Sequence, residues 1–190
     1  MLTDVLEKVA RRESLSHDEM AAAIGTIVGS EVAHPQIAAL LMALRVKGEA
    51  ADELSGAAAA LRARAIRPPI AETPLLDVVG TGGDGSGSLN LSTAAALIAA
   101  AAGITVAKHG NRSVSSRCGS ADLLEQFGVP VEASAEETAR RYADDNFCFL
   151  FAPLYHPAMK AVAPIRRAMR VRTLFNMLGP LTNPVGVKRQ

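Results

Sequence analysis

Cysteine is scarce in this chain. The two cysteines, Cys118 and Cys148, are too few for a disulfide framework, and their spacing is not that of metal ligands. We therefore expect both to be reduced thiols, which is typical of a reducing compartment.

An excess of charge of one sign is also lacking, because 20 Lys and Arg face 19 Asp and Glu and leave a formal net charge of +1. This removes the usual electrostatic basis for proposing nucleic acid or an anionic membrane as a partner. The most apolar run, around residues 94–103, is too short to span a bilayer. The N-terminus lacks the apolar core of a signal peptide. A cytoplasmic globular protein is the remaining expectation.

Residues 1–67 have the pattern of helices throughout. Ser16 and Glu19 have the spacing of a capping box, in which each side chain accepts a hydrogen bond from a backbone N–H at a helix start. Pro35 suits the first position of a second helix, and a third follows at about residues 50–64. We expect a small helical bundle over 1–67. Its alanine-rich faces would permit close helix contacts, including with another subunit.

The pattern changes after a proline-rich break, Arg67-Pro68-Pro69, which we take as a linker. Residues 68–190 then alternate strand and helix, which indicates an α/β domain with a mainly parallel sheet. The expected strands are residues 76–79, 104–107 and 147–151, and the expected helices are residues 92–102, 120–127 and 134–143.

In such a sheet, ligands bind beyond the carboxyl ends of the strands. The first connection there, residues 80–93, is glycine-rich and leads into a helix. Glycines let backbone N–H groups turn toward an anion, and the helix start adds attraction for phosphate. Asp84, Ser92 and Thr93 supply the hard oxygen atoms that Mg²⁺ prefers. A surface loop without a ligand is the alternative, and Ser92 could also be only the helix N-cap.

The second connection, residues 108–120, combines three basic side chains with four serine hydroxyls, a dense set of donors for an anion. A solvated charged turn is the alternative. The third connection, residues 151–157, precedes a helix that carries Lys160, Arg166 and Arg167. Taken alone, its His156 is more typical of a structural histidine, and its arginines are more typical of a solvated face.

Three stretches of this sequence resemble signatures of the anthranilate phosphoribosyltransferases: DVVGTGGDGSGSLNLSTAAA, KHGNRSVSSRCGSADLLEQFG and RTLFNMLGPLTNP. The resemblance implies a nucleoside phosphorylase/phosphoribosyltransferase-type fold and a homodimer, with residues 1–67 as the dimerisation region. It also implies a step of tryptophan biosynthesis, the transfer of a phosphoribosyl group from 5-phosphoribosyl 1-pyrophosphate (PRPP) to the amine of anthranilate, with Mg²⁺ as cofactor. No partner among membranes or nucleic acids is expected.

The resemblance also implies which residues bind each substrate. Ser92 matches a magnesium ligand, Gly80, Asn111 and Arg166 match positions that contact anthranilate, and no residue is assigned a direct catalytic role. The positions that match PRPP-binding residues are Gly80, Gly83, Asp84, Ser88, Asn90, Leu91, Ser92, Thr93, Lys108, His109, Gly110, Asn111, Arg112, Ser113, Val114, Ser115, Ser116 and Ser120.

The chain departs from the family pattern in three places. Cys118 stands where a serine or similar small residue is usual, and Arg170 where glycine is usual. The chain also ends at Gln190, whereas members of the family are considerably longer. The part beyond would carry the remaining strands and an acidic pair for a second magnesium. We therefore expect an unpaired strand edge and little or no turnover from residues 1–190 alone.

Two other functions are kept as alternatives. A pyrimidine nucleoside phosphorylase-like enzyme would share the fold, and an assay with each substrate pair distinguishes it. A non-catalytic nucleic-acid-binding paralogue would need a strongly basic face, against which the near-zero net charge argues.

Overall fold

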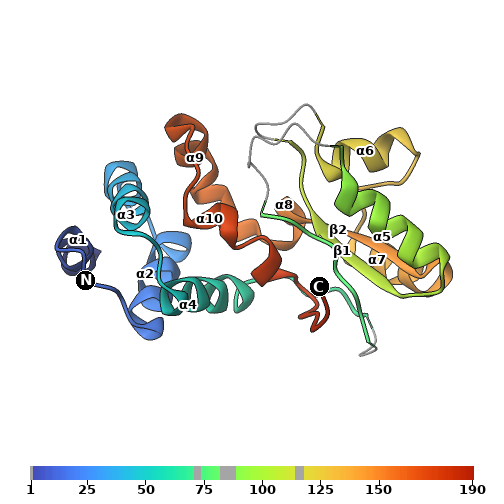
Figure 1. Ribbon diagram of the computed structural model, residues 1–190, viewed down its shortest axis with the longest axis horizontal. Helices are drawn as coiled ribbons and strands as arrows, with labels where there is room; N and C mark the ends of the chain where they lie inside the picture. Colours follow the sequence, from blue (N-terminus) through green and yellow to red (C-terminus); the bar gives the residue numbers. More distant parts are fainter. Residues whose placement is uncertain (1, 71–73, 82–88, 114–117) are drawn as a thin grey trace. The chain divides into compact units, whose positions relative to one another are not determined.

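The computed structural model describes residues 2–70, 74–81, 89–113 and 118–190 (Figure 1). The chain divides into two compact units. The helical unit comprises Met1–Ala65 and His156–Thr182, and the α/β unit comprises Ile66–Tyr155 and Asn183–Gln190. No helix within the described residues is long and apolar enough to cross a membrane.

The first boundary lies between residues 65 and 66, two residues before the expected one, and the membership of one later segment differs. The segment 156–182, which the sequence pattern assigns to the second domain, packs with the helical unit. The reason is its own apolar side chains, because Ile165 and Leu174 are buried in the core of the helical bundle. The chain therefore leaves the α/β unit after Tyr155 and returns to it at Asn183.

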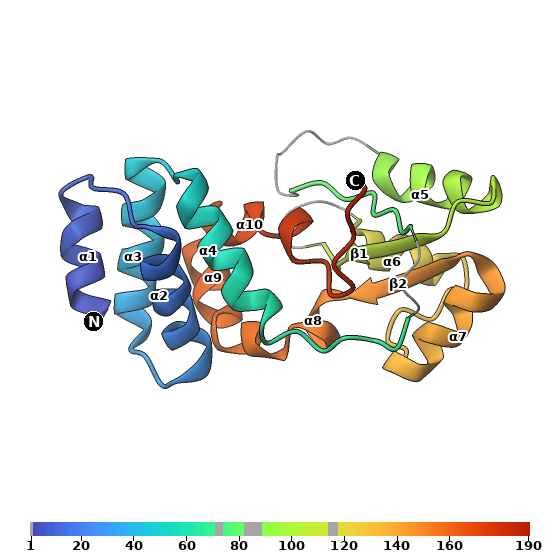
Figure 2. The same ribbon diagram turned by 90° about the horizontal axis from the view of Figure 1, so that it is seen from below.

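The helical unit is built from paired helices. Ser16 and Glu19 form the predicted capping box: Glu19 N donates to Ser16 Oγ at 3.2 Å, and Ser16 N donates to Glu19 Oε2 at 2.7 Å. α1 packs against α3, and α2 packs against α4 (Figure 2). The helices of this unit are α1 (Leu2–Ala10), α2 (His17–Gly29), α3 (His34–Lys47), α4 (Ala51–Arg62), η1 (Pro157–Ala161), α9 (Ala163–Met169), α10 (Leu174–Met177) and η2 (Pro180–Thr182).

The core of the helical unit explains why these helices pair. Ile24 and Ile27 from α2 are fully buried in one apolar cluster with Leu40 and Leu44 from α3. Burying each such side chain contributes about 1.5–3 kcal/mol. α2 and α4 approach each other closely at Gly56, where a Cβ atom would lie 2.2 Å from the carbonyl oxygen of His17. A side chain at this position would therefore force the two helices apart.

Arg170 ends α9 in the left-handed region, with φ +53° and ψ +27°. This conformation costs a residue with a Cβ atom about 1–2 kcal/mol, whereas glycine adopts it readily. We expect Arg170→Gly to raise the free energy of unfolding by about 1 kcal/mol, because the greater freedom of glycine in the unfolded chain offsets part of the gain. Thermal unfolding of wild-type and variant measures this. An unchanged or lower transition temperature would contradict it.

The α/β unit has the predicted parallel sheet with helices against it. β1 (Val106–Gly110) pairs in parallel with β2 (Phe147–Phe151), from Val106 opposite Phe147 to Gly110 opposite Phe151. β2 has the predicted bounds, whereas β1 begins two residues later than expected and includes Lys108 and His109. The helices are α5 (Leu91–Ala101), α6 (Ser120–Gln126), α7 (Ala135–Asp145) and α8 (Ala152–Tyr155).

The two strands separate two small cores. Phe147, Phe149 and Phe151 face residues of α5 and α6, whereas Cys148 and Leu150 face the opposite side. α5 and α7 lie on opposite sides of the strands (Figure 2). Successive side chains of β2 point to opposite faces of the sheet, and both faces are buried. This explains why the sequence of β2, FCFLF, is continuously apolar.

The predicted strand at residues 76–79 is reduced to bridges at Leu76. Leu76 N donates to Thr105 O at 3.0 Å and Leu76 O accepts from Ala107 N at 2.9 Å, so pairing with the neighbouring strand does begin. It stops because side chains take the next backbone groups. His109 N donates to the carboxylate of Asp77, and Val78 O accepts from Lys108 Nζ.

Candidate functional site

The two polar connections meet where their helices begin. Asn90, at the end of the first connection, donates from Nδ2 to the carbonyl oxygen of Gly119 at 3.1 Å and to Cys118 Sγ at 3.4 Å. Gly119 ends the second connection, directly before α6. Two segments far apart in the sequence are thus joined beyond the carboxyl end of β1, as the parallel sheet predicts.

The start of α5 differs from one expectation. The helix begins at Leu91 with Asn90 as N-cap, so the interpretation of Ser92 as the N-cap residue is wrong. The side chain of Asn90 makes no capping hydrogen bond and reaches Gly119 instead. Ser92 is half-buried in the first helical turn, and Thr93 is buried. The first turn of this helix offers backbone N–H groups and a positive dipole end to an anion.

Lys108 and His109 lie in β1 and are buried, not in a solvated turn as the alternative interpretation would have it. Lys108 Nζ donates to Val78 O at 2.5 Å, two residues before Gly80. Burial lowers the pKa of Lys108, and the nearby Asp77 opposes this shift. The ammonium therefore lies close to the start of the glycine-rich connection, where it can attract a polyphosphate.

Asp77 is the main residue that the sequence interpretation missed. Its carboxylate is fully buried and accepts hydrogen bonds from His109 N at 3.1 Å and Asn183 Nδ2 at 2.9 Å. Asn183 Nδ2 also donates to Ala107 O at 2.9 Å, and Asn183 Oδ1 accepts from Val185 N at 3.0 Å. Burial raises the pKa of Asp77, opposed by the hydrogen bonds from Asn183 and His109 and by Lys108. An acidic residue inside the apolar run LLDVV was the available signal.

Further residues of the second connection bind one another. Ser120 Oγ donates to Asn111 O at 3.2 Å, and Arg112 N donates to Asn111 Oδ1 at 2.7 Å. Gly110 permits this packing, because a Cβ atom there would lie 2.3 Å from Ser120 Oγ and 2.7 Å from the Phe149 ring. Arg112 forms ion pairs with three carboxylates, those of Asp122, Glu125 and Glu132.

The predicted anthranilate-binding residues belong to both units. Arg166 belongs to the helical unit, half-buried on α9, with its guanidinium carbon 5.7 Å from the centroid of the Phe175 ring. Gly80 and Asn111 are exposed in the α/β unit. The predicted residues that lie outside the described part of the chain are Gly83, Asp84, Ser88, Val114, Ser115 and Ser116.

In the described part of the chain, the candidate metal ligands are isolated side-chain oxygen atoms that form no cluster. No group of three or more His, Cys, Asp or Glu suited to a metal ion occurs within those residues. The Ser92 hydroxyl fits a Mg²⁺ ion that takes most of its ligands from substrate and water, as this ion usually does. Both cysteines are thiols, and burial raises the pKa of Cys148 to about 12, so this thiol is protonated at neutral pH.

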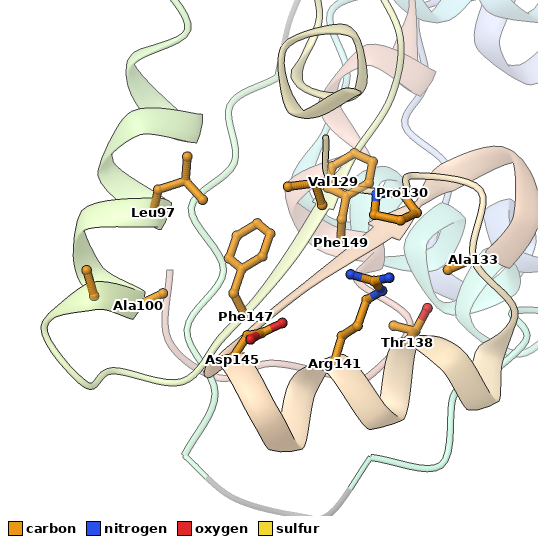
Figure 3. A pocket seen from close by; sticks show the side chains of 11 residues that line it. Leu97, Ala100, Val129, Pro130, Ala133, Thr138, Arg141, Asp145, Phe147 and Phe149 are labelled. Atoms are coloured by element: carbon orange, nitrogen blue, oxygen red, sulfur yellow. The ribbon is translucent and has the colours of Figure 1, made fainter. Parts of the chain in front are cut away.

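A pocket of about 340 Å³ lies away from these connections and is lined by residues of α5, β2 and α7 (Figure 3). Leu97 and Ala100 line it from α5, Phe147 from β2, and Arg141 and Asp145 from α7. It lies at the amino end of β2, whereas the polar connections follow the carboxyl ends of the strands. The pocket therefore is not the site that the sequence predicts.

Comparisons with known proteins cover both units. Residues 72–190 match the family model "Glycosyl transferase family, a/b domain", and residues 3–65 match "Glycosyl transferase family, helical bundle domain". The chain is 50% identical to the anthranilate phosphoribosyltransferase of Bradyrhizobium diazoefficiens, over 100% of this chain and 56% of that protein. The chain thus spans about half the length of the curated relatives it matches.

Solved structures give the same result. The anthranilate phosphoribosyltransferase of Thermus thermophilus matches with a TM-score of 0.88 and 49% identity, over 95% of this chain and 55% of that one. The enzyme of Saccharomyces cerevisiae in complex with PRPP and Mg matches with a TM-score of 0.85 and 30% identity, over 96% of this chain and 55% of that one.

Proposed function

The chain belongs to the glycosyl transferase family, and on this premise we propose that the protein of which it is a part is an anthranilate phosphoribosyltransferase. It would transfer the phosphoribosyl group of PRPP to the amine of anthranilate and release pyrophosphate. The observation that carries the proposal is the junction of the two polar connections through Asn90 and Gly119 at the start of α5, together with the Lys108 ammonium, which donates to a carbonyl two residues before the first connection begins. Relatives named for this activity support it.

The reaction needs positioning and charge neutralisation more than a nucleophilic side chain. The amine of anthranilate is neutral at pH 7, so its lone pair can form a bond to the C1 atom of the ribose while the bond from C1 to the pyrophosphate oxygen breaks. The nitrogen then loses one proton to solvent. Negative charge grows on the leaving group, where the ammonium of Lys108 and the N–H groups of α5 would stabilise it. Holding two reactants in line can account for about 7–11 kcal/mol of the barrier. No Ser or Cys nucleophile is required.

Mg²⁺ would be held by Ser92 and by oxygen atoms of PRPP, and when bound it supplies neutralisation of the pyrophosphate. The S. cerevisiae structure in complex with PRPP and Mg supports this choice of ion. A homodimer through the helical region and a cytoplasmic location stay predictions from the sequence.

Fluorescence of anthranilate tests the proposed function directly. The protein at the length of its relatives should consume anthranilate when PRPP and Mg²⁺ are present, and should not cleave pyrimidine nucleosides with phosphate. Phosphate-dependent nucleoside cleavage without anthranilate consumption would overturn the proposal in favour of a nucleoside phosphorylase.

Arg166 offers a separate test of the anthranilate assignment. A guanidinium pairs well with a carboxylate, and anthranilate carries one. We expect Arg166→Ala to raise the KM for anthranilate roughly 10-fold or more, while the KM for PRPP changes by less than about twofold. Arg167→Ala, an exposed neighbour on the same helix, is the matched control. Equal effects of Arg166→Ala on both KM values would count against the assignment.

A further inference from the structure

Asp122 accepts hydrogen bonds from two backbone groups of the second polar connection. Its Oδ2 atom accepts hydrogen bonds from Ser113 N at 3.0 Å and from Gly119 N at 2.7 Å. The two backbone segments touch at this point, because a Cβ atom on Gly119 would lie 2.3 Å from Ser113 N and 2.6 Å from the carbonyl carbon of Arg112. A single carboxylate therefore fixes how the connection leaves β1 and how it enters α6.

Arg112 forms ion pairs with Asp122 and with two further carboxylates, those of Glu125 and Glu132. Its two terminal nitrogens each donate to one oxygen of Glu125 at 2.6 Å. Nη1 also donates to Asp122 Oδ1 at 3.4 Å, and Nη2 also donates to Glu132 Oε1 at 3.1 Å. The guanidinium carbon also lies 5.5 Å from the centroid of the Phe151 ring, at the end of β2. These carboxylates raise the pKa of Arg112, Glu125 most of all.

This arrangement makes Arg112 a poor phosphate ligand. Three carboxylates surround its positive charge, and a phosphate brought to the same guanidinium would be repelled by them. A planar guanidinium with several donors is instead well suited to connect several carboxylates at once.

The same contacts reach the first connection through Gly119. The N–H of Gly119 donates to Asp122, and its carbonyl oxygen accepts from Asn90 at the start of α5. Asp122 therefore sets the position of a backbone group that joins the two connections. A displacement of Gly119 would move the start of α5 relative to β1.

We propose that Asp122, held in place by Arg112, is a positioning residue for the PRPP-binding loops, and that Arg112 acts through this contact and not on a phosphate. The inference rests on the proposed function. Asp122 touches no substrate in this account, and its effect is to keep the donors of both connections at the spacing that the pyrophosphate requires.

Steady-state kinetics of the protein at the length of its relatives tests the role of Asp122. A shift of about 1 Å in a group that positions the substrate can lower catalytic efficiency about 100-fold. Asp122→Ala should therefore raise the KM for PRPP roughly 10- to 100-fold. The KM for anthranilate at saturating PRPP should change by less than about twofold. Asp122→Asn keeps an oxygen that can accept both N–H groups but loses the charge that pairs with Arg112, and should recover only part of the wild-type KM for PRPP.

Glu137 provides the matched control. It occupies the corresponding first-turn position of α7, where Ser134 caps the helix, and it forms ion pairs with Arg140 and Arg141. Glu137→Ala therefore removes an ion-paired carboxylate from a helix start in the same unit. It should leave the KM for PRPP within about twofold of wild-type, even if both variants lower the transition temperature.

A double-mutant cycle tests the role of Arg112. If Arg112 acts through Asp122, Arg112→Gln should raise the KM for PRPP in the wild-type background and add little in the Asp122→Asn background. Equal effects in both backgrounds would show an independent action of Arg112 and overturn this part of the proposal. The cycle also decides the question if Asp122→Ala does not fold.

Two failures are distinguishable in these assays. An active wild-type protein whose KM for PRPP is unchanged by Asp122→Ala would overturn the positioning role alone. A wild-type protein that consumes no anthranilate with PRPP would overturn the proposed function, and the positioning role with it.

Discussion

Replacing Asp77 with alanine is expected to lower the free energy of unfolding by about 3–5 kcal/mol, the usual cost of removing one partner from a buried charged network. The loss has identifiable parts. His109 N and Asn183 Nδ2 would each lose a buried acceptor, and the Lys108 ammonium would lose the negative charge beside it. Thermal or urea unfolding of the protein at the length of its relatives measures the effect.

Asp77→Asn is the matched control, because it keeps the volume and one acceptor oxygen. The new amide nitrogen would face Asn183 Nδ2, and Asn183 cannot turn its amide without losing the bond from Val185 N to its oxygen. We therefore expect a smaller loss, of about 1–3 kcal/mol. A loss below about 1 kcal/mol for Asp77→Ala would contradict the importance of this network.

The pH dependence provides an independent check on Asp77. Burial raises the pKa of this carboxyl above 3.8, so the folded state keeps the proton to a higher pH than the unfolded state. The contribution of Asp77 to stability therefore falls as the pH rises from about 3.8 through the folded-state pKa. Asp77→Asn should abolish this part of the stability profile.

Replacing Lys108 with methionine is expected to have the largest effect on substrate binding. Methionine preserves much of the apolar stem but removes the ammonium that lies close to the glycine-rich connection. A charged hydrogen bond contributes about 1.5–3 kcal/mol, so the dissociation constant for PRPP should rise about 10- to 150-fold. Lys188→Met, at an exposed lysine of the same unit, should leave it unchanged.

The titration of Lys108 predicts a further property of the wild-type protein. Burial lowers the pKa of this lysine below 10.5, so its charge is lost at a lower pH than that of an exposed lysine. The value of kcat/KM for PRPP should therefore fall in alkaline solution before exposed lysines titrate, because this parameter reports groups of the free enzyme. The same fall in Lys108→Met would mean that another group causes it.

Local signals in the sequence predicted the local structure well. The capping box at Ser16 and Glu19, the bounds of β2 and the parallel alternation of the α/β unit are all confirmed. Each depends on interactions between residues close in the sequence or on a simple apolar period, which is why a single sequence carries them.

Features that depend on residues far apart in the sequence could not be predicted from local patterns. The burial of Lys108 requires Val78 O as its acceptor, and the strand at residues 76–79 is cut short by the side chain of Asp77. Asn183 lies far along the chain from its partner Asp77, and spacing alone does not pair them. The packing of residues 156–182 with the helical unit is likewise a long-range choice, made by apolar side chains such as Ile165 and Leu174.

The most direct test of the account is a calorimetric titration with PRPP of the protein at the length of its relatives. Binding should be saturable, should require Mg²⁺ and should weaken both in Lys108→Met and in Asp122→Ala, because the two connections bind one ligand together. Absence of binding heat in the wild-type protein, or undiminished binding in both variants, would contradict it.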